Sequence, residues 1–499
     1  MSLADRPWAT LGRTLARSVL LAWGAVIVAL AVRLAGKEMD DLFITYRYAL
    51  HLVQGQGFVF NHGERVLGLT NPGLALLLAA LAWPTRLDIP ILATIVFGLS
   101  LLALACIFLW SGSRIGRVPE ALAGGTLLVT SSYLWGQQGG ETIPMLALLA
   151  GAAELCLRRP VLAGLAAGLA VWFRPEAAVA CGILGLLAWI ERRRVPWRFA
   201  AAAFVVIAVG LLAATWYFGT PIPNSLAAKE AMAAGMAESW ARPTRFWLRS
   251  ARLVARHAGP LWQAIVSLGL LGQVPLFVFG GRPGKVLALF ALGLSVIYPV
   301  SGIPWFPWYT LPMAVAVVYG IAFLLGAAVR FVGRRATLPR RVAAALAGCL
   351  LAVPVAVSLL PAAYRWHRFA GGWAPFMERY HQAGLWLAAN SRPEATVSYY
   401  EIGVLGYFSD RTVVDLLGIV TPELLPYVRR GDFQGAFLAR PADYAIFDTV
   451  RGGLMPVAAP WFRGAYSPVA SFGELTVFER MRAVRLPRPT EPRPSDERP

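Results

Sequence analysis

Long apolar segments, separated by short polar connections rich in arginine, dominate the first 360 residues of the chain. A helix rises about 1.5 Å per residue, so an apolar run of roughly 18 residues can cross about 30 Å of hydrocarbon. The pattern predicts about eleven transmembrane helices. We place them at residues 15–35, 90–110, 118–135, 141–157, 161–173, 175–190, 199–218, 261–280, 285–301, 306–329 and 341–361.

One of these segments, 161–173, is too short for an upright crossing and ends at Arg174-Pro175. This indicates a broken or tilted helix, and such interruptions occur in membrane proteins where the backbone lines a polar cavity.

The first connection, residues 36–90, is unusually long and carries structure of its own. The Asp40-Asp41 pair can begin a helix in which apolar residues recur at helical spacing up to Gly55. A second apolar segment, 73–83, is too short to span, so we expect it to lie along the membrane interface or to re-enter the membrane.

The pattern changes after residue 361. Short runs with strand-like composition alternate with helical and turn segments, at residues 395–400, 412–417, 443–447 and 475–478. These runs predict a small α/β domain over residues 362–480, outside a transmembrane domain formed by residues 1–361. The last stretch, 481–499, is rich in Pro, Arg and Glu without apolar periodicity, which is typical of a disordered tail.

Composition agrees with a polytopic membrane protein. Hydrophobic residues make up 57% of the 499 residues and charged residues only 15%, whereas about a quarter is charged in ordinary soluble proteins. The four cysteines lie inside apolar runs, which gives no support to a disulfide framework.

The net charge of +19 follows the positive-inside rule and does not indicate nucleic-acid binding. Basic residues gather in alternate short connections, at Arg114, Arg117, Arg158, Arg159, Arg192, Arg193, Arg194, Arg198, Arg282, Lys285, Arg330, Arg334, Arg335, Arg340 and Arg341. The connections at 136–140 and 302–305 contain no Lys or Arg. We therefore expect a bacterial-type plasma-membrane protein with a cytoplasmic N-terminus and an extracytoplasmic C-terminal domain.

The Asp40-Asp41 pair is the first candidate for chemistry, because few carboxylates are available along the chain. Neighbouring carboxylates with an arginine nearby, here Arg47, can accept a proton from a hydroxyl, hold a metal or organise an anionic substrate. The alternative is a helix N-cap followed by a solvated acid.

Further polar groups lie at the ends of the apolar segments. Glu141 follows a Gly-Gly turn between two apolar spans, and an ionisable group near the membrane is a functional candidate. Arg174 and Glu176 flank a helix break, where they can bind a phosphate or only each other. Polar and aromatic clusters at two other ends contain Asn224, Lys229 and Tyr309; for the aromatics the alternative is an interfacial belt.

Several enzyme classes have no support in the sequence. His51 and His62 fall in the first connection, but no HxxxH or HExxH spacing of a zinc hydrolase occurs. The nucleophile elbow of serine hydrolases and the phosphate-binding loop of nucleotide hydrolases are also missing from the sequence.

The segment DDLFITYRYALHLVQGQGFVFNHGERVLGLTNPGLALLLA, which begins at Asp40, resembles the first external loop of polyprenyl-phosphate-sugar-dependent glycosyltransferases of the GT-C fold. The arabinofuranosyltransferase-like branch is the most similar, with aminoarabinose transferases and protein O-mannosyltransferases more distant. GGET, FRPEA, YFGTPIPNSLAAKE, PWFPWYTLP and YYEIGVLGYFSDRTVVDLLGIVTPE follow in the order of this group. The segment 67–70 reads LGLT, whereas an aromatic-rich sequence is common at this place in the group. The identity of the substrate therefore stays open.

The resemblance implies a role for each candidate residue. It makes the transmembrane domain catalytic, with Asp40 matching the catalytic base of the first external loop and Asp41 as its acidic neighbour; the choice between the two stays open. It further implies that the donor phosphate and the acceptor are bound by Arg47, Glu141, Arg174, Glu176, Asn224, Lys229 and Tyr309. If a divalent cation takes part, Asp41 and Glu141 are the candidate ligands.

The implied function is transfer of a sugar from a polyprenyl-phosphate donor in the membrane to a hydroxyl of a glycan, glycolipid or protein on the non-cytoplasmic face. Direct displacement would invert the anomeric centre. The main alternative is a transporter or flippase of lipid-linked sugars, which also uses intramembrane charges and broken helices. A membrane scaffold and a polymer ligase with a lipid-diphosphate donor are further alternatives.

Overall fold

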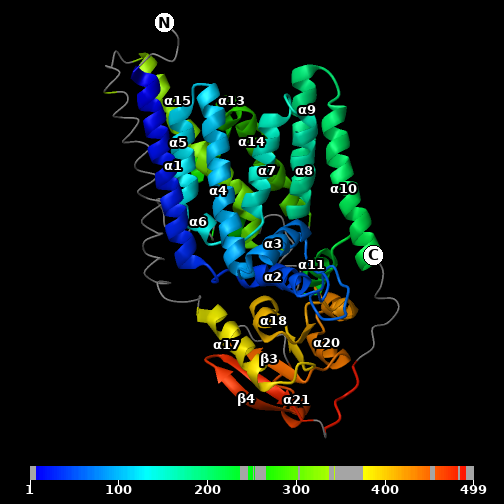
Figure 1. Cartoon of the computed structure of the whole chain (residues 1–499). Coiled ribbons are helices and arrows are strands. Elements are labelled where there is room, and N and C mark those ends of the chain that lie inside the picture. Colours follow the sequence, from blue (N-terminus) through cyan, green and yellow to red (C-terminus); the bar gives the residue numbers. More distant parts are fainter. Residues whose placement is uncertain are drawn as a thin grey trace.

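The computed structural model describes residues 7–235, 246–250, 252, 266–301, 304–335, 342, 375–449, 456–481 and 484–489. Long helices form one layer and a small sheet domain forms another, with short helices between them (Figure 1). The helices of the first layer are α1 (Pro7–Leu34), α4 (Ile89–Arg114), α5 (Val118–Thr130), α6 (Ser132–Trp135), α7 (Thr142–Leu155), α8 (Pro160–Phe173), α9 (Ala177–Arg192), α10 (Trp197–Phe218), α13 (Gln273–Phe279), α14 (Gly281–Val300) and α15 (Leu311–Arg335). The helices between the layers are α2 (Asp40–Val53), α3 (Pro72–Thr85) and α11 (Asn224–Gly235).

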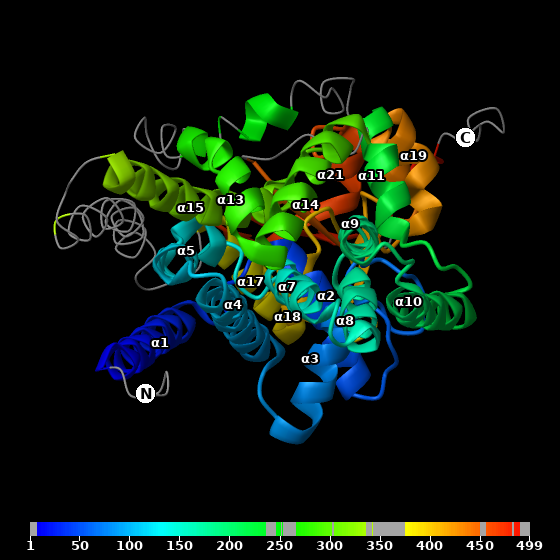
Figure 2. The ribbon, with the colours of Figure 1, turned by 90° about the horizontal axis from the view of Figure 1, so that it is seen from above.

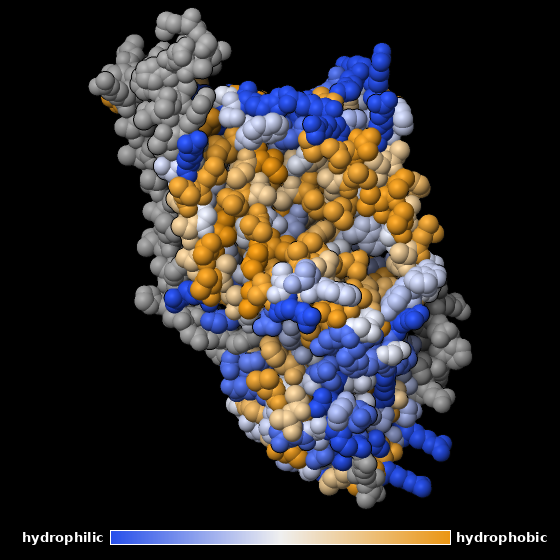
Figure 3. Space-filling view, viewed as in Figure 1, coloured by the Kyte–Doolittle hydropathy of each residue, from blue (hydrophilic) through white to orange (hydrophobic). Residues whose placement is uncertain are grey.

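Five helices among the described residues are long and apolar enough to cross a membrane: Arg17–Leu34, Ile89–Arg114, Trp197–Phe218, Gly281–Val300 and Pro307–Phe331. An apolar band covers this layer in the space-filling view, and polar side chains lie beyond it at both ends (Figure 3). The start of α1 and the connection between α9 and α10 lie at the end away from the sheet domain (Figure 1).

The predicted apolar segments up to 306–329 coincide with helices wherever the structure describes them. The segment 118–135 is two helices, because Ser131 breaks α5 and its hydroxyl accepts a hydrogen bond from the backbone N–H of Leu134, which begins α6. The predicted span at 341–361 apart from residue 342, the boundary at 361/362 and most of the predicted tail lie outside the described residues.

The break predicted after 161–173 is present. Helix α8 ends at Phe173, Arg174 is extended, and α9 begins at Ala177. Gly164 and Gly168 of α8 allow a close approach to α10. A Cβ at Gly164 would lie only 2.3 Å from the carbonyl oxygen of Phe199 in α10. Such pairs of small residues let membrane helices pack backbone to backbone.

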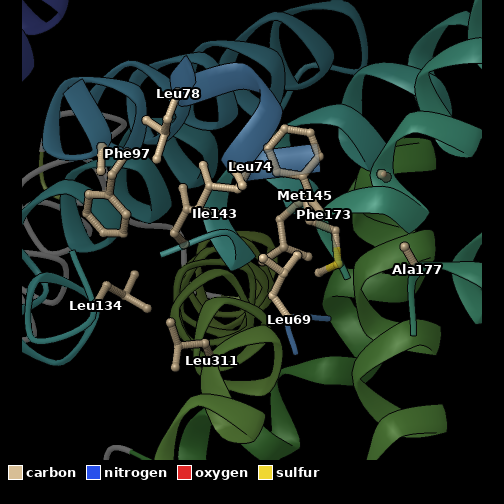
Figure 4. Close-up of a cluster of buried hydrophobic side chains, with 14 of the residues drawn as sticks. Leu69, Leu74, Leu78, Phe97, Leu134, Ile143, Met145, Phe173, Ala177 and Leu311 are labelled. Atoms are coloured by element: carbon tan, nitrogen blue, oxygen red, sulfur yellow. The ribbon is translucent and has the colours of Figure 1, made fainter. Parts of the chain in front are cut away.

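Helix α7 lies in the middle of the helical layer, between α4, α8 and α14 (Figure 2). Its Ile143 and Met145 belong to a cluster of buried side chains to which α3, α4, α8 and α15 also contribute (Figure 4). This packing fixes the ends of the helices that carry the polar residues described below.

The C-terminal domain contains a five-stranded sheet in the order β2-β1-β3-β5-β4. The strands are β1 (Thr396–Tyr399), β2 (Thr412–Asp415), β3 (Tyr444–Asp448), β4 (Tyr466–Phe472) and β5 (Leu475–Arg480). Strand β1 is parallel to β2 and β3, while β5 is antiparallel to β3 and β4. The helices are α17 (Pro375–Asn390), α18 (Gly403–Ser409), η3 (Pro422–Leu424), α19 (Leu425–Arg430), α20 (Phe433–Ala439) and α21 (Pro460–Ala465).

The four strand-like runs of the sequence match β1, β2, β3 and β5. Strand β4 was not predicted, because it is an edge strand with a half-exposed pattern, a proline at position 468 and a register shift beside it. These features weaken the alternation of apolar and polar residues from which strands are predicted.

Candidate active site

A polar cavity of about 110 Å³ lies where the helical layer meets the sheet domain. Its charged lining residues are Asp41 from α2, Glu141 from the turn before α7 and Lys229 from α11. The remaining wall residues are Met39, Leu42, Ile44, Thr45, Gly68, Leu69, Thr70, Asn71, Gln137, Gly140, Thr142, Ser225, Trp308, Leu311 and Ile419. The first connection (residues 36–90), the Gly-Gly turn, α11 and the C-terminal domain thus all contribute to the cavity wall.

The two neighbouring aspartates face different surroundings. Asp41 lines the cavity. Asp40 is buried, and its carboxylate accepts hydrogen bonds from the backbone N–H groups of Gly403 (3.0 Å) and Val404 (2.8 Å) at the start of α18. A Cβ at Gly403 would lie only 1.8 Å from the Asp40 carbonyl oxygen. Asp40 therefore joins α2 to the sheet domain, whereas Asp41 is the aspartate of the pair that contributes to the cavity wall.

Glu141 belongs to a network of buried polar side chains. One carboxylate oxygen accepts from Asn71 Nδ2 (3.0 Å) and the other accepts from Arg174 Nη1 (2.7 Å). Asn71 in turn accepts from the hydroxyl of Thr45 (2.9 Å). These bonds hold Glu141 in the cavity wall beside α2.

The Arg174 guanidinium is shared between two carboxylates. It donates to Glu141 and, through Nε, to Glu176, which also accepts from the Tyr298 hydroxyl at 2.6 Å. Arg174 and Glu176 are not among the described lining residues of the cavity. The structure thus contains the ion pair, one of the two alternatives left open by the sequence, at the break between α8 and α9.

Three other predicted site residues also lie outside the described cavity wall. Arg47 points to the C-terminal domain and donates to the carbonyl oxygens of Gly406 and Arg411, both at 2.7 Å. Asn224 donates to the carbonyl oxygens of Gly418 and Ile419 (2.7 and 2.8 Å).

The third, Tyr309, presents its ring to Lys229 Nζ at 5.6 Å and to Arg174 at 5.7 Å. Within the described part of the chain, the Lys229 ammonium contacts the rings of Tyr309 and Phe306 and has no carboxylate partner. A cation that contacts aromatic rings, and that has no carboxylate within ion-pair distance among the described residues, is suited to an anionic ligand.

The Gly-Gly turn before Glu141 allows α2 to come close. Gly139 has φ +75°, and its carbonyl oxygen accepts a hydrogen bond from the buried Tyr46 hydroxyl at 3.2 Å. A Cβ at this position would lie 2.1 Å from the Tyr46 oxygen, so only glycine fits.

The C-terminal wall of the cavity was not predicted. Ile419 lies in a loop held by the buried Asp415 carboxylate, which accepts from the N–H groups of Leu417 (2.9 Å), Ile419 (2.5 Å) and Val420 (3.2 Å). Burial raises the pKa of Asp415 to about 6, and these bonds oppose the rise. The run VVDLLGIV, with one acid among apolar residues, was the signal for this loop in the sequence.

A second, apolar cavity of about 1180 Å³ lies in the helical layer between α3, α4, α7, α8 and α10. Its lining includes Leu67, Pro72 and Gly73, while residues 68–71 between them line the polar cavity. The segment 67–73 therefore contributes to the walls of both the apolar cavity and the polar cavity.

For a divalent cation the structure brings Asp41 together with Asp40 and Glu401, whose ligand atoms all lie within 4.8 Å of one another. Glu141, the second ligand predicted from the sequence, is not in this group; its oxygens are engaged by Asn71 and Arg174.

Glu38, next to the site, gives a prediction for the pH dependence of stability. Burial raises its pKa to about 7, although Thr94 donates to it at 2.6 Å. The folded state therefore holds a proton between pH 4.5 and 7 that the unfolded chain releases, so this group makes stability fall as pH rises through that window.

We expect Glu38→Gln to remove this pH dependence of stability. Relative to the wild type, the free energy of unfolding of the variant should rise by up to about 3 kcal/mol between pH 4.5 and pH 8. The measurement is the melting temperature of both proteins in detergent from pH 4.5 to 8. Parallel curves for the two proteins would contradict the prediction.

Comparisons with known proteins agree with the architecture. Over 223 residues the chain is 29% identical to the terminal β-(1→2)-arabinofuranosyltransferase of Mycobacterium tuberculosis (strain ATCC 25618 / H37Rv), in an alignment that covers 38% of this chain and 35% of that protein. The chain thus matches little more than a third of the length of this curated relative. Residues 372–490 match DUF8728, a domain of unknown function.

Among solved structures, ArnT from Cupriavidus metallidurans bound to undecaprenyl phosphate superposes with a TM-score of 0.57 at 13% identity, over 94% of this chain and 99% of that chain. ArnT in the apo state gives a TM-score of 0.60 at 12% identity, over 95% and 100%. The archaeal oligosaccharyltransferase AglB from Archaeoglobus fulgidus, in complex with an inhibitory peptide and a dolichol-phosphate, gives 0.50 at 14% identity, over 90% and 70%.

These likenesses confirm the fold predicted from the sequence. The chain is an integral membrane protein of the GT-C fold, with a small C-terminal sheet domain.

Proposed function

We propose that this protein is a membrane glycosyltransferase that transfers a sugar from a polyprenyl-phosphate donor to an acceptor hydroxyl. The observation that carries the proposal is the pair of adjoining cavities, one apolar and about 1180 Å³, the other holding Asp41, Glu141 and Lys229. A lipid-linked sugar phosphate needs both surroundings within one molecule. The complexes of ArnT with undecaprenyl phosphate and of AglB with a dolichol-phosphate support the same class of ligand.

In the proposed reaction the Asp41 carboxylate accepts the proton of the acceptor hydroxyl as its oxygen attacks the anomeric carbon. The bond between that carbon and the phosphate oxygen breaks, and the carrier phosphate leaves with the electron pair. Lys229 stabilises the charge that develops on the phosphate. Direct displacement inverts the anomeric centre, which the stereochemistry of the product would test.

We propose that the polar cavity and the sheet domain lie on the non-cytoplasmic side. The α9–α10 connection, which is rich in arginine, lies at the opposite end of the helical layer together with the start of α1. Clustered arginines in short connections are typical of the cytoplasmic side. A glycan, glycolipid or protein of the cell envelope would then be the acceptor.

The decisive experiment uses the purified full chain in lipid vesicles with a panel of radiolabelled polyprenyl-phosphate sugars, matched nucleotide sugars as controls, and cell-envelope acceptors. We expect transfer only from a lipid-linked donor, with release of the carrier phosphate. Movement of labelled donor between leaflets without any transfer would instead support the alternative, a flippase of lipid-linked sugars.

We expect Lys229→Met to lower kcat/KM for the lipid donor about 10- to 100-fold, since a charged hydrogen bond contributes roughly 1.5–3 kcal/mol. Arg429→Met is a matched control, because Arg429 is a cation at the α11–α19 contact, where it pairs with Glu230 at 4.0 Å. Equal activities of the two variants would remove Lys229 from the proposed site.

A further inference from the structure

Three metal-ligating side chains meet outside the polar cavity, where the first external loop contacts the C-terminal domain. The Nε2 atoms of His51 and His62 each lie 3.3 Å from Oδ1 of Asp410. The two imidazole rings are 4.6 Å apart between centroids. All three ligand atoms lie within 4.8 Å of one another.

The hydrogen bonding of His51 fixes which of its nitrogens can bind a ligand. Its Nδ1 lies 3.0 Å from the carbonyl oxygen of Val59, which can only accept, so Nδ1 carries the hydrogen. In the neutral ring Nε2 then presents a lone pair to the Asp410 carboxylate, and two acceptors face each other. A cation between them resolves this conflict, and a backbone carbonyl on the far nitrogen is the usual support of a metal-binding histidine.

The spacing fits tetrahedral zinc. With Zn–N distances of about 2.0–2.1 Å and Zn–O distances of about 2.0–2.2 Å, neighbouring ligand atoms lie roughly 3.3–3.5 Å apart. The two histidine-to-aspartate distances of 3.3 Å in the structure match this spacing. Neutral imidazole and carboxylate are also ligands that zinc prefers.

The backbone positions all three ligands. Asp410 ends α18 in a left-handed conformation with φ +50°, which aspartate tolerates. Asn61, next to His62, donates to the Val413 carbonyl and accepts from the Val413 N–H, both at 2.9 Å, so the loop is tied to β2. Helix α2 supplies His51.

The surrounding charges set the expected affinity. Arg47 lies one turn before His51 on α2 and is directed to the carbonyls of Gly406 and Arg411. Because this cation repels a metal ion and the group has only one carboxylate, we expect weaker zinc binding than in closed sites made of thiolates. Half of the Asp410 side chain is exposed, which leaves room for water as the fourth ligand.

We propose that His51, His62 and Asp410 form a Zn²⁺ site that clamps the first external loop to the C-terminal domain. The site lies at the same α2–α18 contact as the Asp40 bonds to Gly403 and Val404. Zinc bound there stabilises the folded state by mass action and holds the domain over the polar cavity. The inference does not depend on the proposed transferase activity.

The test uses the full chain in detergent with an affinity tag free of histidine, stripped with chelator and titrated with ZnCl₂. We expect one zinc per chain by elemental analysis, a higher melting temperature with zinc, and a tetrahedral absorption spectrum with Co²⁺ in its place. His62→Asn, at a partly exposed position, should weaken zinc binding at least about 10- to 100-fold, as should Asp410→Asn.

His381→Asn is the matched control, because His381 lies outside the cluster, and Asp41→Asn controls for binding at the acidic group of the cavity. Both should keep the zinc stoichiometry of the wild type. No zinc bound by the wild type at micromolar free metal would overturn the proposal. Loss of zinc in Asp41→Asn with retention in His62→Asn would overturn it as well.

Discussion

Replacing Asp41 by asparagine is expected to lower the turnover of sugar transfer by about 10²- to 10⁴-fold, the range typical of losing a general base. The asparagine side chain would keep its size in the cavity wall but could not accept the acceptor's proton. The measurement is the initial rate of transfer from the lipid-linked donor, together with the melting temperature in detergent. The melting temperature should stay close to that of the wild type.

Asp40→Asn is the matched comparison, because it makes the same chemical change one residue away. The Asp40 carboxylate accepts hydrogen bonds from two backbone N–H groups of α18. We therefore expect Asp40→Asn to lower the free energy of unfolding by roughly 1.5–3 kcal/mol. A variant Asp41→Asn with full activity, beside an inactive but stably folded Asp40→Asn, would reverse the assignment of the base.

The distinction between these two aspartates could not be made from the sequence. The sequence predicted that α2 begins at the pair and that it follows the first transmembrane helix, since both depend on local patterns. Which carboxylate faces the cavity depends on α18, which lies more than 360 residues further along the chain. The same holds for Arg47, whose partners Gly406 and Arg411 are equally distant.

Local patterns predicted the helices well for a physical reason: in lipid, an apolar run must satisfy its backbone internally, and a helix does so. Polar contacts between distant segments leave no such period in the sequence. His51 and His62 illustrate this, since their spacing matches no metal motif and only the fold brings Asp410 to them.

Replacing Arg174 by methionine is expected to destabilise the protein by about 3–5 kcal/mol, because it leaves the carboxylates of the buried Glu141 and the partly buried Glu176 without their cation. The Arg174 side chain bridges Glu141 and Glu176 at the break between α8 and α9. The measurement is thermal unfolding in detergent. Arg174→Lys should recover only part of the loss, since an ammonium lacks the planar fork that contacts both carboxylates.

The double variant Arg174→Met/Glu176→Gln distinguishes two roles of Arg174, a partner of the buried network or a residue that binds the donor phosphate. If the arginine serves the network, removing one of its carboxylates should restore part of the lost stability, with a coupling energy of about 0.5–3 kcal/mol. If Arg174 instead bound the donor phosphate, the single variant would melt like the wild type and raise KM for the donor, and adding Glu176→Gln would not restore that KM. The first outcome leaves Lys229 as the cation in the cavity wall that can meet a phosphate, because the described part of the chain gives it no carboxylate partner.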